Sequence, residues 1–158
     1  MPRRALASLL SVAMLLAAGP ALACRLPEGA ARLADATLAA INAERGQRGM
    51  ALLDPDPQLT AAAQAHACDS AARNRMSHRG SDGSTIARRV QREGYAYRII
   101  AENVAAGYRS AGAVMQGWMN SSGHRRNILD RTARDVGIGL ATARDGTLHW
   151  VLNLGSRR

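Results

Sequence analysis

Apolar residues recur along the chain at two different spacings, which divide the sequence into a helical part and a strand part. Up to about residue 120 they return every three or four positions, the spacing of one face of a helix. In the first stretch this apolar stripe consists of Leu33, Ala36, Ala40 and Ile41. The pattern predicts helices at residues 30–45, 58–75, 85–93 and 110–120.

Glycine, proline, serine and aspartate gather between these stretches and predict turns and loops. Residues 54–57 are expected to form a turn, and residues 76–83 a loop. Ser84 is expected to cap the third helix, because a serine hydroxyl accepts hydrogen bonds from the free N–H groups at a helix start. Residues 96–107 form a short extended or mixed segment, and Ser121-Ser122-Gly123 ends the fourth helix.

After residue 135 the spacing changes to two, which is typical of strands. Large residues alternate with Gly137 and Gly139, so a neighbouring element can pack closely on the small face. Asp145-Gly146 is a hairpin turn signal, and the returning strand alternates again as far as Leu154. Helices followed by a C-terminal hairpin predict an α+β fold in which helices cover a small antiparallel sheet.

The first residues have the features of an export signal. Two arginines precede an apolar run at residues 5–18, and Ala21-Leu22-Ala23 fits a small-x-small cleavage site. We therefore expect residues 1–23 to be a cleaved signal peptide, residues 24–158 to form a single domain, and the mature protein to be secreted or periplasmic. The apolar run is shorter than the roughly 20 residues of a membrane span, and no transmembrane span is expected in the mature chain.

The sequence contains two cysteines, Cys24 and Cys68. In an exported protein two cysteines favour one disulfide, which would tie the start of the mature chain to the second helix. The alternative is a lipoprotein anchored through Cys24, which would leave Cys68 free. This alternative is less favoured, because Ala21 occupies the position where bacterial lipoprotein signals usually carry leucine.

The chain is basic, with a formal net charge of +9, and all 21 of its basic residues are arginine. Such a charge favours loose attraction to anionic polymers such as cell-wall or membrane surfaces. The arginines are scattered, with few aromatic residues between them, and no nucleic-acid motif accompanies them. A nucleic acid is therefore not an expected partner.

The histidines and one glutamate are the candidates for chemistry. His66 lies on a small apolar helix face and His149 in mid-strand, so both are expected to be packed and hydrogen-bonded, His149 to a cross-strand partner. His78 and His124 lie in Gly/Ser-rich loops, where functional groups are often held. Glu102 lies inside an apolar run, so it must be exposed, paired or in a site. His78, Glu102 and His124 could bind zinc with one position open, or could act as general acid and base without a metal.

Several short motifs in a fixed order resemble a known family. They are Ile41–Arg45 (INAER), Met76–His78 (MSH) with Ser81–Gly83 (SDG), Ala101–Ala105 (AENVA), Trp118–Leu129 (WMNSSGHRRNIL) and Val136–Gly139 (VGIG). Together they resemble the CAP superfamily of cysteine-rich secretory proteins, antigen 5 and pathogenesis-related 1, and in particular its bacterial secreted branch. The resemblance implies an α-β-α sandwich with a central cleft in which His78, Glu102 and His124 converge.

The sequence departs from the family pattern at one position. The resemblance implies a cleft that holds two histidines and two glutamates in eukaryotic members, where the histidines can take a divalent metal. The second glutamate belongs three residues after the helix tryptophan, and that position is Ser121. A serine cannot replace a carboxylate in acid–base work at neutral pH. We count Ser121, and Asn103 beside Glu102, among the cleft residues.

Three functions stay open. The favoured one is a binding domain for a peptide, glycan or lipid of the cell envelope or medium, with no required cofactor and with Zn²⁺ or another divalent cation as an optional ligand of His78 and His124. The second is a metal-assisted hydrolase in which Glu102 positions or deprotonates a water. The third is a hydrogen-bond network with a structural role only. The missing carboxylate favours binding, and we expect the protein to act as a monomer.

Overall fold

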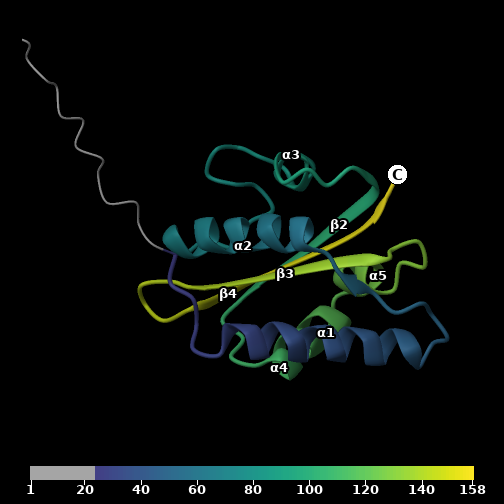
Figure 1. Cartoon of the computed structure of the whole chain (residues 1–158). Coiled ribbons are helices and arrows are strands. Elements are labelled where there is room, and N and C mark those ends of the chain that lie inside the picture. The colour runs from purple at the N-terminus through teal and green to yellow at the C-terminus, as the bar shows by residue number, and fades with distance from the viewer. Residues whose placement is uncertain (1–23) are drawn as a thin grey trace, which may run out of the picture.

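The computed structural model describes residues 24–158, so the predicted signal peptide lies outside the described residues (Figure 1). The helices are α1 (Ala30–Gly46), α2 (Pro57–Ala72), α3 (Ile86–Arg92), α4 (Ala111–Asn120) and α5 (Ser122–Ile128). The strands are β1 (Asp54–Pro55), β2 (Tyr97–Ala106), β3 (Asp135–Thr142) and β4 (Leu148–Arg157). Within the described range, no helix is long and apolar enough to cross a membrane.

The strands form one sheet in the order β1-β3-β4-β2. The predicted C-terminal hairpin is confirmed, because β3 and β4 pair antiparallel around the turn at Gly146. Strand β2 pairs antiparallel with β4 and forms one edge of the sheet. The small antiparallel sheet has one addition that was not predicted: Asp54 and Pro55, expected in a turn, pair parallel with the start of β3.

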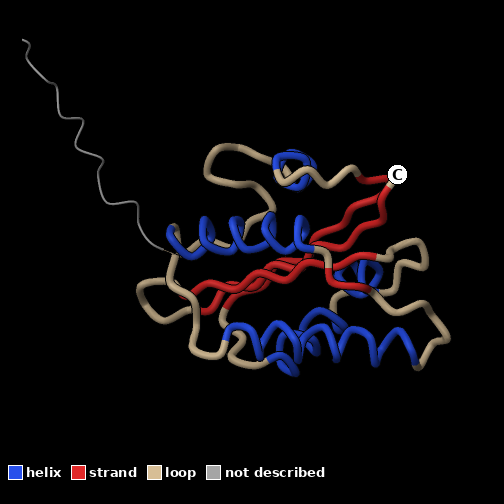
Figure 2. The backbone as a smooth tube through the Cα atoms, viewed as in Figure 1, coloured by secondary structure: helices blue, strands red, loops and turns tan. Residues whose placement is uncertain are grey.

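Helices cover both faces of the sheet, which confirms the α-β-α sandwich (Figures 1 and 2). α2 and α3 lie over one face, and α1, α4 and α5 lie over the other. The alternation of β4 explains this division. Leu152 and Leu154 point into the larger core with α1 and α4, whereas Val151 points into the smaller core with α2.

The glycines of β3 set the distance between α2 and the sheet. An added Cβ at Gly137 would lie 2.1 Å from the carbonyl carbon of Leu59, and one at Gly139 would lie 2.3 Å from that of Ala63. The prediction of a close approach on this small face is therefore confirmed. Asp56 fixes where α2 starts, since its side chain accepts hydrogen bonds from the first backbone N–H groups of the helix.

Three local predictions differ from the structure. In α1, Ala36 is exposed, and the buried face carries Arg45, which is fully buried. The N-cap of α3 is Thr85 rather than Ser84, because the helix begins one residue later than expected, at Ile86, and no side-chain hydrogen bond caps it. The chain after Ser121 forms the short helix α5 instead of a loop.

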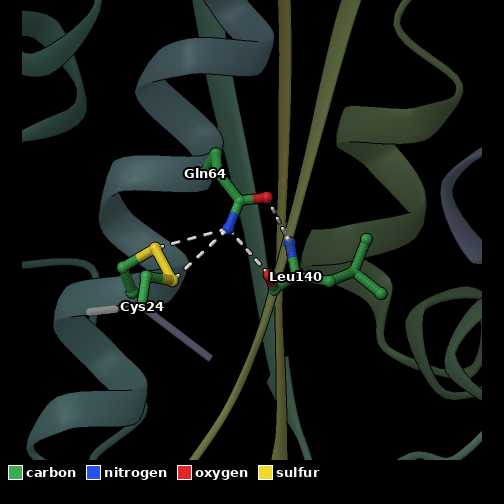
Figure 3. Close-up of a disulfide and its surroundings, with 4 residues drawn as sticks. Cys24, Gln64 and Leu140 are labelled. Atoms are coloured by element: carbon green, nitrogen blue, oxygen red, sulfur yellow. Dashed lines mark hydrogen bonds between the residues drawn. A yellow bond between two sulfur atoms is a disulfide. The ribbon is translucent and has the colours of Figure 1, made fainter. Parts of the chain in front are cut away.

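A disulfide joins Cys24 to Cys68, as the sequence predicts (Figure 3). It connects the first described residue to α2, so the thiol that a lipid anchor would need is already bonded. Gln64 lies beside it. Its amide donates to the carbonyl oxygen of Leu140 at 2.7 Å and lies 3.3 Å from the sulfur of Cys68, and its oxygen accepts from the Leu140 N–H. This amide therefore joins the disulfide region to β3.

Candidate functional site

The candidate site is built around the edge strand β2, whose alternating side chains point to opposite faces of the sheet. Glu102 faces the side of α2 and α3, where its partners lie. Asn103, the next residue, faces the side of α5. The site therefore straddles the edge of the sheet, and each face contributes one histidine.

Glu102 is buried, and both of its carboxylate oxygens are engaged. Its side chain is 2% exposed. One oxygen lies 2.9 Å from Nδ1 of His78, and the other accepts a hydrogen bond from Nη2 of Arg89 at 2.6 Å. A buried carboxylate needs this kind of pairing, because burial of an unpaired charge is costly. Glu102 thus positions other groups and has almost no contact with solvent.

Arg89 of α3 is the site residue that the sequence reasoning missed. Besides Glu102, its guanidinium donates to the carbonyl oxygen of Ser84 at 2.9 Å and to that of His78 at 3.3 Å. These bonds hold the middle and the end of the loop that carries His78. The sequence does not distinguish Arg89 from the other arginines of the chain. The apolar stripe of this helix identifies Val90 as buried, but it does not indicate that the neighbouring Arg89 forms an ion pair.

His78 lies on the loop between α2 and α3 and presents its ring to the outside. Its side chain is 61% exposed, although Nδ1 is held by Glu102. A ring anchored through Nδ1 presents Nε2 to a ligand, the arrangement by which a hydrogen-bonded carboxylate orients a histidine. His66 supports the same loop from behind: its Nε2 donates to the carbonyl oxygen of Ser77 at 2.7 Å, and it is buried, as predicted.

His124 lies in the first turn of α5 and is half-buried. Its carbonyl oxygen accepts a hydrogen bond from the Asn103 amide at 3.1 Å. The Asn127 amide in turn donates to the Asn103 oxygen at 2.8 Å, so two asparagines attach α5 to the sheet edge. Burial and the nearby charge of His78 lower the pKa of His124 below its ordinary value. The ring is therefore neutral at pH 7.

Ser121 separates α4 from α5. Its extended backbone ends one helix and starts the other, with no side-chain capping bond at α5. Ser121 is half-buried, and it occupies the position where the family resemblance implies a carboxylate. The turn at Ser121 directs α5 toward β2, and with it His124.

The side chains of the site do not form a metal cluster with three or more protein ligands. Across residues 24–158 no cluster of three or more His, Cys, Asp or Glu side chains has a geometry that could hold an ion. The remaining histidine, His149, bonds through Nε2 to the Asn74 oxygen at 3.1 Å. The expectation of a cross-strand partner for His149 is thus wrong, because its partner follows α2.

The arrangement can bind a ligand, and its imidazoles are also groups that can transfer protons. It presents two imidazoles at a sheet edge, one anchored by a buried ion pair and one carried by a helix that two asparagines attach. Neutral imidazole nitrogens can donate or accept hydrogen bonds or ligate a metal.

Comparisons with known proteins agree with this architecture. A sequence profile described as the cysteine-rich secretory protein family (CAP) matches residues 38–154. The Bacillus subtilis protein named "Uncharacterized protein YkwD" is 33% identical over 98 residues, or 62% of this chain and 38% of that protein. An extracellular protein containing a SCP domain from Bacillus anthracis has a similar structure, with a TM-score of 0.72 at 28% identity over 81% of this chain and 41% of that one.

The fold also occurs in more distant proteins. An outer surface protein from Borrelia burgdorferi has a TM-score of 0.71 at 20% identity, over 77% of this chain and 90% of that one. The curated relatives are longer than this chain: it spans 38% of YkwD and 29% of the Bacillus subtilis protein named "Uncharacterized membrane protein YlbC".

Proposed function

This chain is a member of the cysteine-rich secretory protein (CAP) family, and we propose that it is an extracellular binding protein whose ligand contacts His78 and His124. The expected location rests on the predicted export signal at residues 1–23 and on the similar protein from Bacillus anthracis, which is described as extracellular. The ligand class is a peptide, glycan or lipid of the cell envelope or medium.

One observation carries the choice of binding over catalysis. A general base must lie within hydrogen-bonding reach of the proton that it removes. Both oxygens of Glu102 are hydrogen-bonded, one by His78 and one by the Arg89 guanidinium, and the side chain is only 2% exposed, which keeps a substrate water away from it. The second carboxylate of the family pattern is replaced by Ser121. His78 remains exposed, with Nε2 free to meet a ligand.

The binding test compares the protein with a His78→Ala/His124→Ala double variant in sedimentation with purified cell-wall polymer and with lipid vesicles. We expect the double variant to lose most of the bound fraction. Arg144→Ala, in the exposed turn between β3 and β4, removes a surface charge outside the site and is expected to bind normally. Equal binding by all three proteins would contradict a ligand at the histidine pair.

The same proteins test the hydrolase alternative. Peptides, esters and cell-wall fragments are incubated with each protein and the products are analysed by mass spectrometry. The proposal expects no product. Turnover that disappears in Glu102→Gln would overturn it in favour of the hydrolase.

Zinc at the histidine pair is a separate prediction that titration calorimetry can decide. The two imidazoles would supply two ligands to the zinc. The proposed binding function does not require the metal. Imidazole must be neutral to ligate, so zinc should bind more weakly at about pH 5 than at about pH 7.5. Affinity that is unchanged in the double variant would place any zinc elsewhere on the protein.

A further inference from the structure

Strand β2 is an outer strand of the sheet, so only one of its two sides is paired. β4 lies along its inner side, and no other strand of residues 24–158 lies along its outer side. α3 contacts β2 from one face of the sheet and α5 contacts it from the other (Figure 1). The outer side of β2 therefore runs between these two helices, at the same edge as the histidine pair.

The hydrogen bonds of the sheet show which backbone groups of β2 point outward. Gly107 donates to the carbonyl oxygen of Leu148 at 2.9 Å, and these two residues continue the register of β2 and β4. In an antiparallel pair, every second residue bonds to the partner strand, and the residues between direct their N–H and C=O groups away from it. The odd-numbered residues 101–105 therefore bond to β4. The outward residues are Ile100, Glu102, Val104 and Ala106.

Two further contacts agree with this assignment. Ala143 donates to the carbonyl oxygen of Thr147 at 2.8 Å, so the odd-numbered residues of β4 bond to β3 and leave its even-numbered residues to bond to β2. The Asn127 amide, from α5, donates to the carbonyl oxygen of Glu102 at 3.3 Å, which requires that oxygen to point away from β4. The oxygen keeps a second lone pair for another donor.

The backbone of the outward residues is nearly unpaired and reaches the surface. Among residues 24–158, no backbone hydrogen bond from outside the sheet reaches them, and the bond from Asn127 is the only one from a side chain. Ile100 and Ala106 are partly exposed. Glu102 as a whole is 7% exposed but its side chain only 2%, so its remaining exposure belongs mostly to its backbone. A ligand at this edge can therefore contact backbone donors and acceptors.

We propose that the ligand of the histidine pair is a peptide in an extended conformation, which pairs with the outer side of β2 as an additional strand. This inference rests on the proposed function and narrows its ligand class to a peptide. An extended peptide presents one N–H and one C=O to the same side at every second residue, which is the spacing of the outward residues. A glycan or a lipid has no such backbone. Addition of a peptide to an exposed sheet edge is a recurrent mode of recognition.

The added strand would pass between the two histidines. The side chains of a strand alternate between the two faces of a sheet. His78 is held by Glu102 on the face of α3, whereas His124 is held through Asn103 on the face of α5. Alternate side chains of the peptide would therefore meet His78 and His124. At about 3.3 Å per residue, the outward residues span about 20 Å, so about seven peptide residues cover them.

NMR of the isotope-labelled protein tests this pairing at single residues. In the free protein, we expect the amides of the outward residues to exchange hydrogen at least about tenfold faster than those of the odd-numbered residues 101–105. The probe is a capped seven-residue peptide of alternating threonine and valine, which both favour strands. It should move the amide proton resonances of the outward residues to higher frequency in a saturable way. The odd-numbered residues keep their bonds to β4, so their shifts should be much smaller.

A matched probe is the same peptide with methyl groups on two successive central nitrogens. Successive N–H groups point to opposite sides of a strand, so this peptide carries a methyl group on each side and keeps its side chains. We expect it to bind at least about tenfold more weakly. Equal binding of the two peptides, equal shifts at the outward and odd-numbered residues, or no saturable shift would overturn the strand pairing.

Two proline variants form a matched pair in the protein. Ala106→Pro removes one outward N–H, at an edge position where a strand tolerates proline, and should weaken peptide binding at least about tenfold. Slow exchange at residues 101–105 would show that its sheet is intact. Arg144→Pro is expected to bind the peptide normally. Gly146 donates to the carbonyl oxygen of Ala143, so Arg144 is the second residue of a turn, where proline fits. Equal peptide binding by both variants would contradict pairing at this edge.

The inference and the proposed function fail in different experiments. If the peptide causes no shift but the His78→Ala/His124→Ala variant loses its binding to cell-wall polymer or vesicles, the strand pairing is wrong and the ligand site at the histidines stands. The same double variant should bind the peptide at least about tenfold more weakly, because it loses contacts on both faces. Unchanged peptide binding by that variant would separate β2 from the histidine pair and overturn the inference.

Discussion

At the residue scale, two buried arginines hold segments together that are far apart in sequence. Arg45 is fully buried and donates to the carbonyl oxygens of Ile128 and Asp130, at and just after the end of α5. Arg89 joins α3 to β2 through Glu102. The planar guanidinium suits this task because it directs several donors at fixed angles. Part of the positive charge of the chain is therefore structural and does not reach an anionic surface.

The Arg89–Glu102 pair gives a prediction about stability. Glu102→Gln leaves the Arg89 guanidinium buried without a counterion, and removing one partner of a buried pair typically costs about 3–5 kcal/mol. We expect a loss near the lower end, about 3 kcal/mol, because the remaining amide oxygen can still accept one hydrogen bond. Urea denaturation measures this loss. Glu44→Gln breaks the exposed pair with Arg48 and should cost less than about 1 kcal/mol. Equal losses of stability in the two variants would show that the buried Arg89–Glu102 pair stabilises the protein no more than the exposed Glu44–Arg48 pair does.

The histidines predict how stability depends on pH. Burial is the main cause that lowers the pKa of His66, His124 and His149 in the folded state. In the unfolded chain histidine has a pKa of about 6.5, so below that pH the unfolded state binds more protons. The free energy of unfolding should therefore be constant just above about pH 7 and fall as the pH drops from about 6.5 toward about 5.

Denaturation by urea at each pH checks this dependence, with His149→Gln as the comparison. That variant removes one of the three groups and should make the fall with pH shallower. The carboxylate of Asp69, whose hydrogen bonds to Ser81 and Arg73 lower its pKa against the effect of burial, acts only in a more acidic range. A stability that rises as the pH is lowered from about 7 to about 5 would contradict the effect of the buried histidines.

At the scale of elements, the sequence predicts the helices and strands that have a repeated apolar pattern. It misses those that depend on a single tertiary contact. The main helices and the hairpin follow from periodic spacing over many residues. β1 consists of Asp54 and Pro55, and pairing with β3 defines it, so no local pattern reveals it. α5 is short and follows directly on Ser121, where Ser and Gly indicate a break. A second helix there depends on Ile128 entering the core, a tertiary effect.

The contact between α2 and β3 gives a prediction at this scale. Gly139→Ala places a methyl group 2.3 Å from the carbonyl carbon of Ala63, and the helix backbone can yield only as a unit. Overpacking of this kind typically costs about 1–3 kcal/mol, and we expect the upper end in thermal or urea denaturation. Gly112→Ala, in α4 with nothing within 4 Å of the added atom, should instead stabilise the protein by about 0.5 kcal/mol. A Gly139→Ala protein of unchanged stability would contradict the close packing.

At the scale of the whole molecule, the candidate site depends on segments that fold far from one another in sequence. Family motifs in the sequence indicate His78, Glu102 and His124, but not how they are held. Arg89 and Asn127 lie in α3 and α5, and their roles arise only when both helices meet the edge strand β2. Such partners could not be predicted, because nothing in the local sequence distinguishes an exposed arginine or asparagine from one in a buried hydrogen-bond network.

The disulfide ties the start of the described chain into this assembly and gives the last prediction. It closes a segment with a sequence separation of 44, and beside it the Arg25 carbonyl oxygen accepts a hydrogen bond from Thr142 at the end of β3. On the chain-entropy account such a loop stabilises the folded state by about 3–4 kcal/mol. Cys68→Ala should therefore lower the free energy of unfolding by about that amount in urea, and a reductant should lower that of the unchanged protein similarly. Intact mass should rise by two hydrogens on reduction. Unchanged mass and stability would mean that the two thiols are not joined. Because the disulfide anchors only the terminal segment at Cys24, ligand binding at the histidine pair should survive loss of the disulfide.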